Sequence, residues 1–255
     1  KSVDLGGRRI IKKKKRKQKR ARGSRCKIGE GWWEAARGVG EAYGVAARHA
    51  LVIATGYAIV LDAMPLAEEG RWAAVALDLA VGGMLFGMAT FGFVALFKWL
   101  AVRRYGQRAA PMWTPFVWLS EAATNLYEGV AVPWFLRYLR GTPWLNDALK
   151  LLGADIGRGV FLDTTDMTEF DCVHIGAHSE LNALCCPQTH LFEDRVMKID
   201  HVRIGSRVTL GPRCTVLYGA QVGDGAQLGP LTLVMKGEQI PAGTLWHGLP
   251  AAPWR

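Results

Sequence analysis

The C-terminal part of the chain places aliphatic residues at a fixed spacing of six. The series runs from Ile204 to Ile240 without a break, and glycine follows four of its members. Its members are Ile204, Leu210, Val216, Val222, Leu228, Val234 and Ile240. An amphipathic helix repeats every 3.6 residues and a strand every two, so neither explains this period. A period this short is typical of a solenoid, in which three hexads form one triangular coil of about 18 residues.

The same spacing begins upstream and is interrupted once. Hexads start at Ile156 and Leu162, and again at Ile175 and Leu181. The step from Ile175 to Ile204 is 29 residues, which is not a multiple of six. We therefore expect an excursion from the coil there, in the sequence QTHLFEDRVMKIDHVR. Residues 153–255 are predicted to form a parallel β-helix of about five coils.

Two apolar segments occupy residues 50–102. ALVIATGYAIVLDAMPLA and WAAVALDLAVGGMLFGMATFGFVALFKWLAV are separated by EEGR. Leu79–Phe97 carries no charge and is close to the about 20 residues that cross a bilayer. The first segment contains Asp62 and Pro65 and is the weaker candidate. We predict a two-helix transmembrane hairpin within residues 28–108.

Residues 109–152 have the pattern of amphipathic helices, in PFVWLSEAATNLYEGVAVPWFLRYLR and WLNDALKLLG. Their apolar stripes either lie in the membrane interface or cap the next domain. The hairpin immediately before them favours the interface. We treat 109–152 as an amphipathic helical connector.

The position of the charged residues along the chain is more informative than the net charge. The formal net charge is +10, but residues 1–27 hold 14 basic residues and one acid, which leaves a slightly acidic body. A block of like charge repels itself and is expected to be a disordered tail or linker. Basic residues flank both ends of the hairpin, so the positive-inside rule predicts that the N-terminus and the β-helix are cytoplasmic. The protein is then a multi-pass protein of the plasma membrane, in contact with membrane lipid. Nucleic acid is not an expected partner.

The repeat, together with His190 in a TH segment and a turn containing Gly248, Pro250 and Ala251, resembles the hexapeptide-repeat acyltransferases. That family has a left-handed parallel β-helix. A closer resemblance covers residues 103–251. The strings RGTPWLNDALKLLGADIGRGVFLDTTDMTEFDCVHIG, QTHLFEDRVMK and LGPLTLVMKGEQIPAGTLWHGLPA are similar to the C-terminal region of nonribosomal peptide synthetases of the ε-poly-L-lysine synthetase type.

The resemblance implies an acyltransferase that forms amide bonds. In that family, β-helix domains take an aminoacyl group from the phosphopantetheine thioester of a carrier domain and pass it to a small-molecule amine acceptor. This chain has no recognisable adenylation domain or carrier serine motif, so it corresponds to the last membrane hairpin and the last β-helix unit. Its partners are then the carrier domain and either sister β-helix domains or two identical copies in a homotrimer.

Such a transfer needs a base near neutral pKa and donors for the developing oxyanion. His190 is the candidate base, since it lies in the excursion and matches the histidine of the family. Glu193 and Asp194 are candidates to orient its ring or attract an ammonium acceptor, although a solvated loop pair with Arg195 is the simpler reading. Asn182 is a candidate donor to the acyl oxygen.

Gln188 and Thr189 are further candidate donors to the acyl oxygen. The remaining histidines and Cys185–Cys186 do not match a zinc pattern, so no metal is expected. The five cysteines are too irregular for a disulfide framework, which favours a reducing compartment. Two other functions remain open for the β-helix. One is a free-standing O- or N-acetyltransferase that uses CoA, and the other is a noncatalytic oligomerisation or scaffold module.

Overall fold

The computed structural model describes residue 50 and residues 52–254. The expected basic tail, 1–27, and the first part of segment 28–108 lie outside these residues. Contacts divide the chain into two units at residue 54, and the labelled elements below belong to the unit that begins at Thr55. The boundaries proposed at 108/109 and 152/153 stay predictions.

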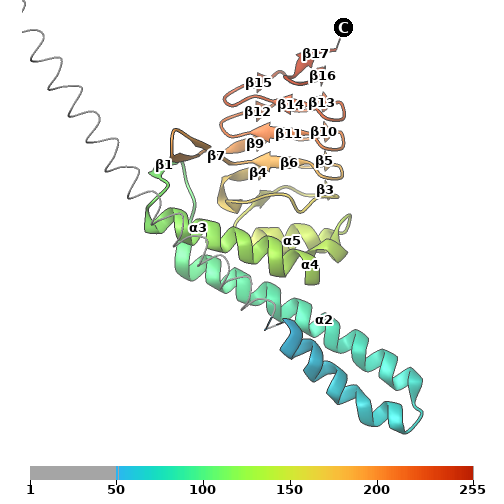
Figure 1. The fold of residues 1–255 in the computed structure, drawn as a ribbon. Helices are drawn as coiled ribbons and strands as arrows, with labels where there is room; N and C mark the ends of the chain where they lie inside the picture. Colours follow the sequence, from blue (N-terminus) through green and yellow to red (C-terminus); the bar gives the residue numbers. More distant parts are fainter. Residues whose placement is uncertain (1–49, 51, 255) are drawn as a thin grey trace, which may run out of the picture. The chain divides into compact units, whose positions relative to one another are not determined.

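Parallel strands stack in three sheets and form the expected β-helix (Figure 1). One sheet contains β2 (Asp155–Ile156), β4 (Val173–Ile175), β9 (Val202–Ile204), β12 (Gln221–Val222) and β15 (Gln239–Ile240). The second contains β3 (Phe161–Leu162), β5 (Glu180–Leu181), β10 (Thr209–Leu210), β13 (Gln227–Leu228) and β16 (Leu245–His247), with β17 (Ala252–Pro253) antiparallel on β16. The third contains β6 (Cys186–Gln188), β11 (Thr215–Leu217) and β14 (Leu233–Val234). The hexad period is thus confirmed as the period of the coil sides.

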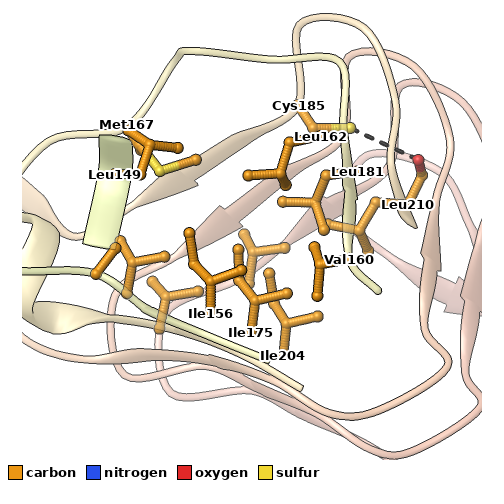
Figure 2. Packing of buried hydrophobic residues seen from close by; sticks show 14 of the residues in the cluster. Leu149, Ile156, Val160, Leu162, Met167, Ile175, Leu181, Cys185, Ile204 and Leu210 are labelled. Carbon is orange, nitrogen blue, oxygen red and sulfur yellow. Dashed lines mark hydrogen bonds between the residues drawn. The ribbon is translucent and has the colours of Figure 1, made fainter. Parts of the chain in front are cut away.

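The aliphatic residue of each hexad points inward and stacks on its counterpart in the next coil. Figure 2 shows one column of Ile156, Ile175 and Ile204 and a second that includes Leu181 and Leu210. All five side chains are buried. Burying one such side chain contributes about 1.5–3 kcal/mol relative to leaving it exposed, so the columns are the main support of the coil stack.

The glycines that follow the aliphatic residues are required by close backbone approach. A Cβ added to Gly176 would lie 2.5 Å from the carbonyl carbon of Gly205, far inside van der Waals contact. The amide of Gly176 also donates to the carbonyl of Ile204, 2.8 Å away, which fixes this approach. A side chain here would push two coils apart.

The coil departs from its regular length in two places. Ile156 pairs with Ile175, 19 residues away, whereas regular coils pair Val222 with Ile240, 18 residues away. The added residue lies in an irregular coil side that includes the short helix η4 (Phe170–Cys172). In the second place the chain leaves the coil after β6 and forms the hairpin β7 (His190–Glu193) and β8 (Val196–Ile199). The expected excursion is therefore confirmed, and a strand from outside the β-helix, β1 (Arg108–Pro111), extends it by pairing with β8.

The connector forms a helical cap on the first coil. Its elements are α3 (Pro115–Leu126), η2 (Tyr127–Ala131), α4 (Val132–Trp134), η3 (Leu136–Leu139) and α5 (Pro143–Leu151). Leu145 and Leu149 of α5 are fully buried in the same core as Ile156. Of the two alternatives for these apolar stripes, the structure has the cap, because the open end of a β-helix would otherwise expose its core.

Two apolar helices precede the connector in the part of the chain that the structure describes, and one of them has the length to cross a bilayer. Residues 52–68 are helical, and α2 (Trp72–Phe97) continues into η1 (Lys98–Val102). Within the described residues, Trp72–Val102 alone has the length and composition of a membrane span, and only 22% of its most apolar window is buried. The described helical residues 52–68 contain Asp62 and Pro65 and are not a candidate span. The expectation of two spans and a multi-pass topology is therefore not supported.

Candidate active site

The central feature of the candidate site is a contact between His190 and Glu169. Nδ1 of His190, the first residue of β7, lies 2.8 Å from Oε2 of Glu169. The Glu169 side chain is completely buried, and that of His190 is 13% exposed. One ring edge of the histidine is therefore held inside the protein while the side chain keeps some access to solvent.

Three hydroxyl groups surround the buried carboxylate. Thr189 Oγ1 donates to Glu169 Oε2 at 2.6 Å, and Thr168 Oγ1 donates to the same oxygen at 2.7 Å. Ser120 Oγ, on α3, lies 3.4 Å from Oε1. Hydrogen bonds to an ionised carboxylate are the stronger kind, so this arrangement favours the charged form of Glu169.

The electrostatics of the pair follow from this burial and pairing. Burial opposes ionisation of Glu169, but the hydrogen bonds from His190, Thr189 and Thr168 outweigh it and lower the pKa of the carboxyl. Burial likewise opposes protonation of His190, yet the Glu169 hydrogen bond and charge prevail and raise the pKa of the imidazole. An ionised Glu169 can only accept, so Nδ1 of His190 carries the proton and Nε2 is left as an acceptor.

The irregular coil side explains how a glutamate reaches this position. Glu169 has a φ of 40°, a left-handed conformation that non-glycine residues adopt rarely and at a cost. It immediately precedes η4, and Phe170 packs edge-on against Tyr127 with ring centroids 4.9 Å apart. The added residue between Ile156 and Ile175 is the sequence signal for this departure, and Glu169 was not among the expected site residues.

The structure does not bring Glu193 or Asp194 to His190. Glu193 Oε2 accepts from Lys198 Nζ at 2.7 Å, and its other oxygen accepts from Lys236. Asp194 is exposed in the β7–β8 turn with a φ of 52°. The acid that contacts the imidazole is Glu169 instead, because β7 runs away from the histidine and carries the later acids to the hairpin tip.

The expected amide and hydroxyl donors are also placed elsewhere. Asn182 Nδ2 donates to the carbonyl of Leu210 in the next coil at 2.9 Å, a structural hydrogen bond between coils. Gln188 Nε2 donates to the backbone carbonyl of His190 at 2.9 Å. Of the three, Gln188 and Thr189 support the histidine, through its backbone and through Glu169 respectively, and Asn182 does not contact it.

A second group of histidines lies on the outer face of the sheet that contains β4. His174 Nε2 lies 2.8 Å from His201 Nδ1, and His174 Nδ1 lies 3.1 Å from Asp155 Oδ2. An open cleft of about 500 Å³ runs along this face, and its lining includes Asp155, His174 and Arg203. Asp155 is 79% exposed at its side chain, so it fixes His174 far less firmly than the buried Glu169 fixes His190. Among the described residues no group of three or more His, Cys, Asp or Glu side chains is arranged to hold a metal ion.

Comparison with known proteins finds one clear relative in sequence. No family model matches the chain. The Delta-poly-L-ornithine synthetase of Acinetobacter baumannii (strain AB307-0294) is 52% identical over 205 residues, which are 80% of this chain. The match spans 15% of that synthetase, so most of the relative has no counterpart in this chain.

Two solved structures show a partial likeness. A galactoside acetyltransferase in complex with coenzyme A is 18% identical, with a TM-score of 0.38 over 47% of this chain and 76% of that one. A hexapeptide-repeat acetyltransferase from Vibrio cholerae, complexed with acetyl coenzyme A, is 14% identical, with a TM-score of 0.38 over 47% of this chain and 82% of that one. The hexapeptide-repeat fold itself is evident from the strand pairing. With this fold and 52% identity over four-fifths of its length, the chain is homologous to a segment of a poly-amino-acid synthetase.

Proposed function

We propose that the β-helix is an acyltransferase domain that transfers an aminoacyl group from a thioester to an amine. His190 is the general base and Glu169 orients it. The single observation that carries the proposal is the 2.8 Å contact between His190 Nδ1 and the fully buried Glu169 carboxylate. A buried acid that fixes one ring nitrogen, and leaves the other as an acceptor, is the arrangement a base requires.

The reaction balances with these two residues and the two substrates. The amine nitrogen attacks the thioester carbonyl carbon, a C–N bond forms, and the C–S bond breaks. Nε2 of His190 takes the proton that the amine loses and gives it to the leaving thiolate, which departs as a thiol. Glu169 stays ionised throughout and stabilises the imidazolium.

The charges around His190 suit a cationic acceptor. Glu121 and Glu128 act with Glu169 to raise the pKa of His190. Burial, and then the negative charge of Asp166, raise the pKa of Glu128. An excess of negative charge attracts an ammonium group, and a diamino acid keeps one ammonium after the other amine has lost its proton. We propose ornithine or a similar diamino acid as the acceptor, in keeping with the product named for the related synthetase.

The donor, partners and location complete the proposal. The donor is the phosphopantetheine thioester of a carrier domain, and acyl-CoA is the alternative. Sister β-helix domains, or copies of this chain, are the proposed neighbours of the β-helix. Attachment to the membrane is through α2, with the β-helix on the cytoplasmic side.

The test is amide formation by the 255-residue chain. The chain is incubated with an ornithinyl-pantetheine thioester and free ornithine, and the dipeptide is measured by mass spectrometry. His190→Gln is expected to reduce the rate by about 10²- to 10⁴-fold, the usual contribution of a general base. The control is His247→Gln, which changes an exposed histidine on β16.

The donor classes are separated in the same assay. Transfer from the pantetheine thioester and not from acetyl-CoA supports the carrier-linked donor. Transfer from acetyl-CoA alone favours a free-standing acetyltransferase. An unchanged rate in His190→Gln contradicts the assignment of the base and leaves a noncatalytic β-helix as the better account.

A further inference from the structure

The segment that follows the apolar helix is tied to the coil side that carries Glu169. Lys98, the first residue of η1, is 1% exposed, and its Nζ lies 2.7 Å from Oδ2 of Asp171. The amide of Tyr105 donates to the same oxygen at 3.1 Å. Asp171 is in η4, two residues after Glu169. The ion pair therefore links the end of the apolar helix to the coil side that contains Glu169.

A glycine makes room for this ion pair. A Cβ added to Gly153 would lie 2.5 Å from Asp171 Oδ1 and 3.1 Å from Lys98 Nζ. Gly153 also has a φ of 111°, which side chains with a Cβ adopt poorly. Both the space and the backbone at Gly153 are thus adapted to a buried ion pair between two distant parts of the chain.

The same segment reaches the Glu169 carboxylate through hydroxyl groups. Ser120 Oγ lies 3.3 Å from the Tyr105 hydroxyl and 3.4 Å from Glu169 Oε1. Burial raises the pKa of Tyr105, so its hydroxyl stays protonated. Ser120 and Tyr105 are both buried, which makes this a fixed connection to the second oxygen of the carboxylate.

A separate route from this segment reaches the histidine. In the sheet β1–β8–β7, Arg108 pairs with Ile199, and Ile199 pairs with His190. The backbone of His190 is therefore in register with a strand that begins six residues after η1 ends. Residues 98–111 are therefore connected to the two members of the His190–Glu169 pair by separate indirect routes: to Glu169 through Asp171 and Ser120, and to His190 through β8.

We propose that residues 98–111, fastened by the Lys98–Asp171 ion pair, are a positioning element that sets the geometry of the Glu169–His190 pair. The inference rests on the function proposed for His190 and extends it, because it makes the site depend on how the apolar helix is seated. Lys98 and Asp171 are positioning residues and take no part in the chemistry. A buried ion pair is seldom the most stabilising choice at a packed interface, which favours a role in specifying one arrangement.

The experiment neutralises the ion pair in the 255-residue chain without leaving a charge unpaired. The double variant Lys98→Met/Asp171→Asn keeps an acceptor for the Tyr105 amide. The first readout is the titration of His190, followed by NMR on histidine-labelled protein and assigned with His190→Gln; it requires no substrate. The second readout is kcat and KM in the thioester assay. The matched control is Lys150→Met/Asp147→Asn, which removes an exposed ion pair of 3.8 Å on α5.

The double variant is expected to move the pKa of His190 toward its usual value by about half a unit or more. It is also expected to lower kcat by about ten-fold, part of the contribution of a general base, with little change in KM for the thioester. The control variant should change neither quantity. A folded double variant with the original His190 titration and kcat overturns the proposal.

Two further results keep the two proposals distinct. If the unaltered chain transfers no acyl group from any thioester, the proposed function fails, and the His190 titration alone decides the positioning role. If the double variant does not fold, Ser120→Ala is the second test, since it removes only the hydroxyl between Tyr105 and Glu169. An unchanged His190 titration in a folded Ser120→Ala variant then overturns the proposal.

Discussion

Oε2 of Glu169 lies 2.8 Å from Nδ1 of His190, although Glu169 belongs to a coil of the β-helix, His190 begins the hairpin that leaves it, and the two are 21 positions apart. Glu169 is buried and receives two threonine hydroxyls on the same oxygen, so the contact is rigid on the carboxylate side. It gives the histidine one defined tautomer, with Nε2 as the acceptor.

Replacing Glu169 should change both the rate and its dependence on pH. In the unaltered chain the rate of amide formation should rise with pH as His190 loses its proton, at a pKa above the usual value of about 6.5, because Glu169 raises it. Glu169→Gln removes the charge that raises the pKa of His190. The rise of the pH–rate profile should therefore move to lower pH, and the maximal rate should fall by about 10- to 100-fold. Rates measured between pH 5 and 9 test this. Glu238→Gln is the control, since Glu238 accepts from the Met235 amide in a surface turn. A pH–rate profile that does not shift in Glu169→Gln contradicts the pairing of Glu169 with His190.

The pair should also make stability depend on pH in a defined direction. The raised pKa of folded His190 contributes stability that is fully present below the pKa of the unfolded chain and is lost as pH rises through the folded value. His190→Gln should therefore lower Tm more at pH 6 than at pH 9. Thermal unfolding at both values tests this, and a larger loss at pH 9 would contradict it.

Substituting Glu193 should have little effect on the rate. Its carboxylate pairs with Lys198 and Lys236 on the surface, and these lysines lower its pKa to about 2. Exposed ion pairs contribute little to stability. Glu193→Gln is expected to retain the rate of the unaltered chain within about two-fold, in contrast to Glu169→Gln. A loss as large as that of Glu169→Gln would restore Glu193 as the orienting acid.

Two glycines in equivalent hexad positions should respond differently to alanine. A Cβ at Gly176 would lie 2.5 Å from the Gly205 backbone, whereas a Cβ at Gly229 would lie 3.4 Å from His247 Cβ, which is an ordinary van der Waals contact. Gly176→Ala should cost about 1–3 kcal/mol or more, as overpacking does, and Gly229→Ala less than about 1 kcal/mol. Denaturant unfolding of both variants measures the difference, and equal losses would contradict the role assigned to backbone approach.

Charge on the exposed face of α2 should weaken the proposed membrane attachment. Leu85 is 56% exposed in the middle of the helix. An arginine at the centre of a membrane helix costs about 2.5–3.5 kcal/mol. Leu85→Arg should therefore shift the chain from the membrane fraction toward the soluble fraction after flotation. Leu184→Arg, at a residue 46% exposed on the β-helix, is the control and should not change the distribution.

The sequence by itself determined the β-helix. A period of six cannot be satisfied by a helix or by hairpins, and only a coil with three sides buries every member of the series from Ile204 to Ile240. The break between Ile175 and Ile204 likewise located the excursion and its histidine, because a stacked coil cannot absorb a step of that length. These features depend on spacing along the chain, which is read directly from the sequence.

Only the tertiary structure decided which side chains meet. Glu193 and Asp194 are nearest to His190 in sequence, but alternation along β7 and the turn after it carry them away. Glu169 contacts the ring from a coil side that is one residue longer than the regular length and in which Glu169 has a left-handed φ. The partners of His190 depend on stacking between coils and on the cap, which bring together positions that no local pattern relates. For the same reason the ion pair between Lys98 and Asp171 could not be predicted from the sequence. Lys98 follows an apolar helix, Asp171 lies in an irregular turn, and 73 positions separate them.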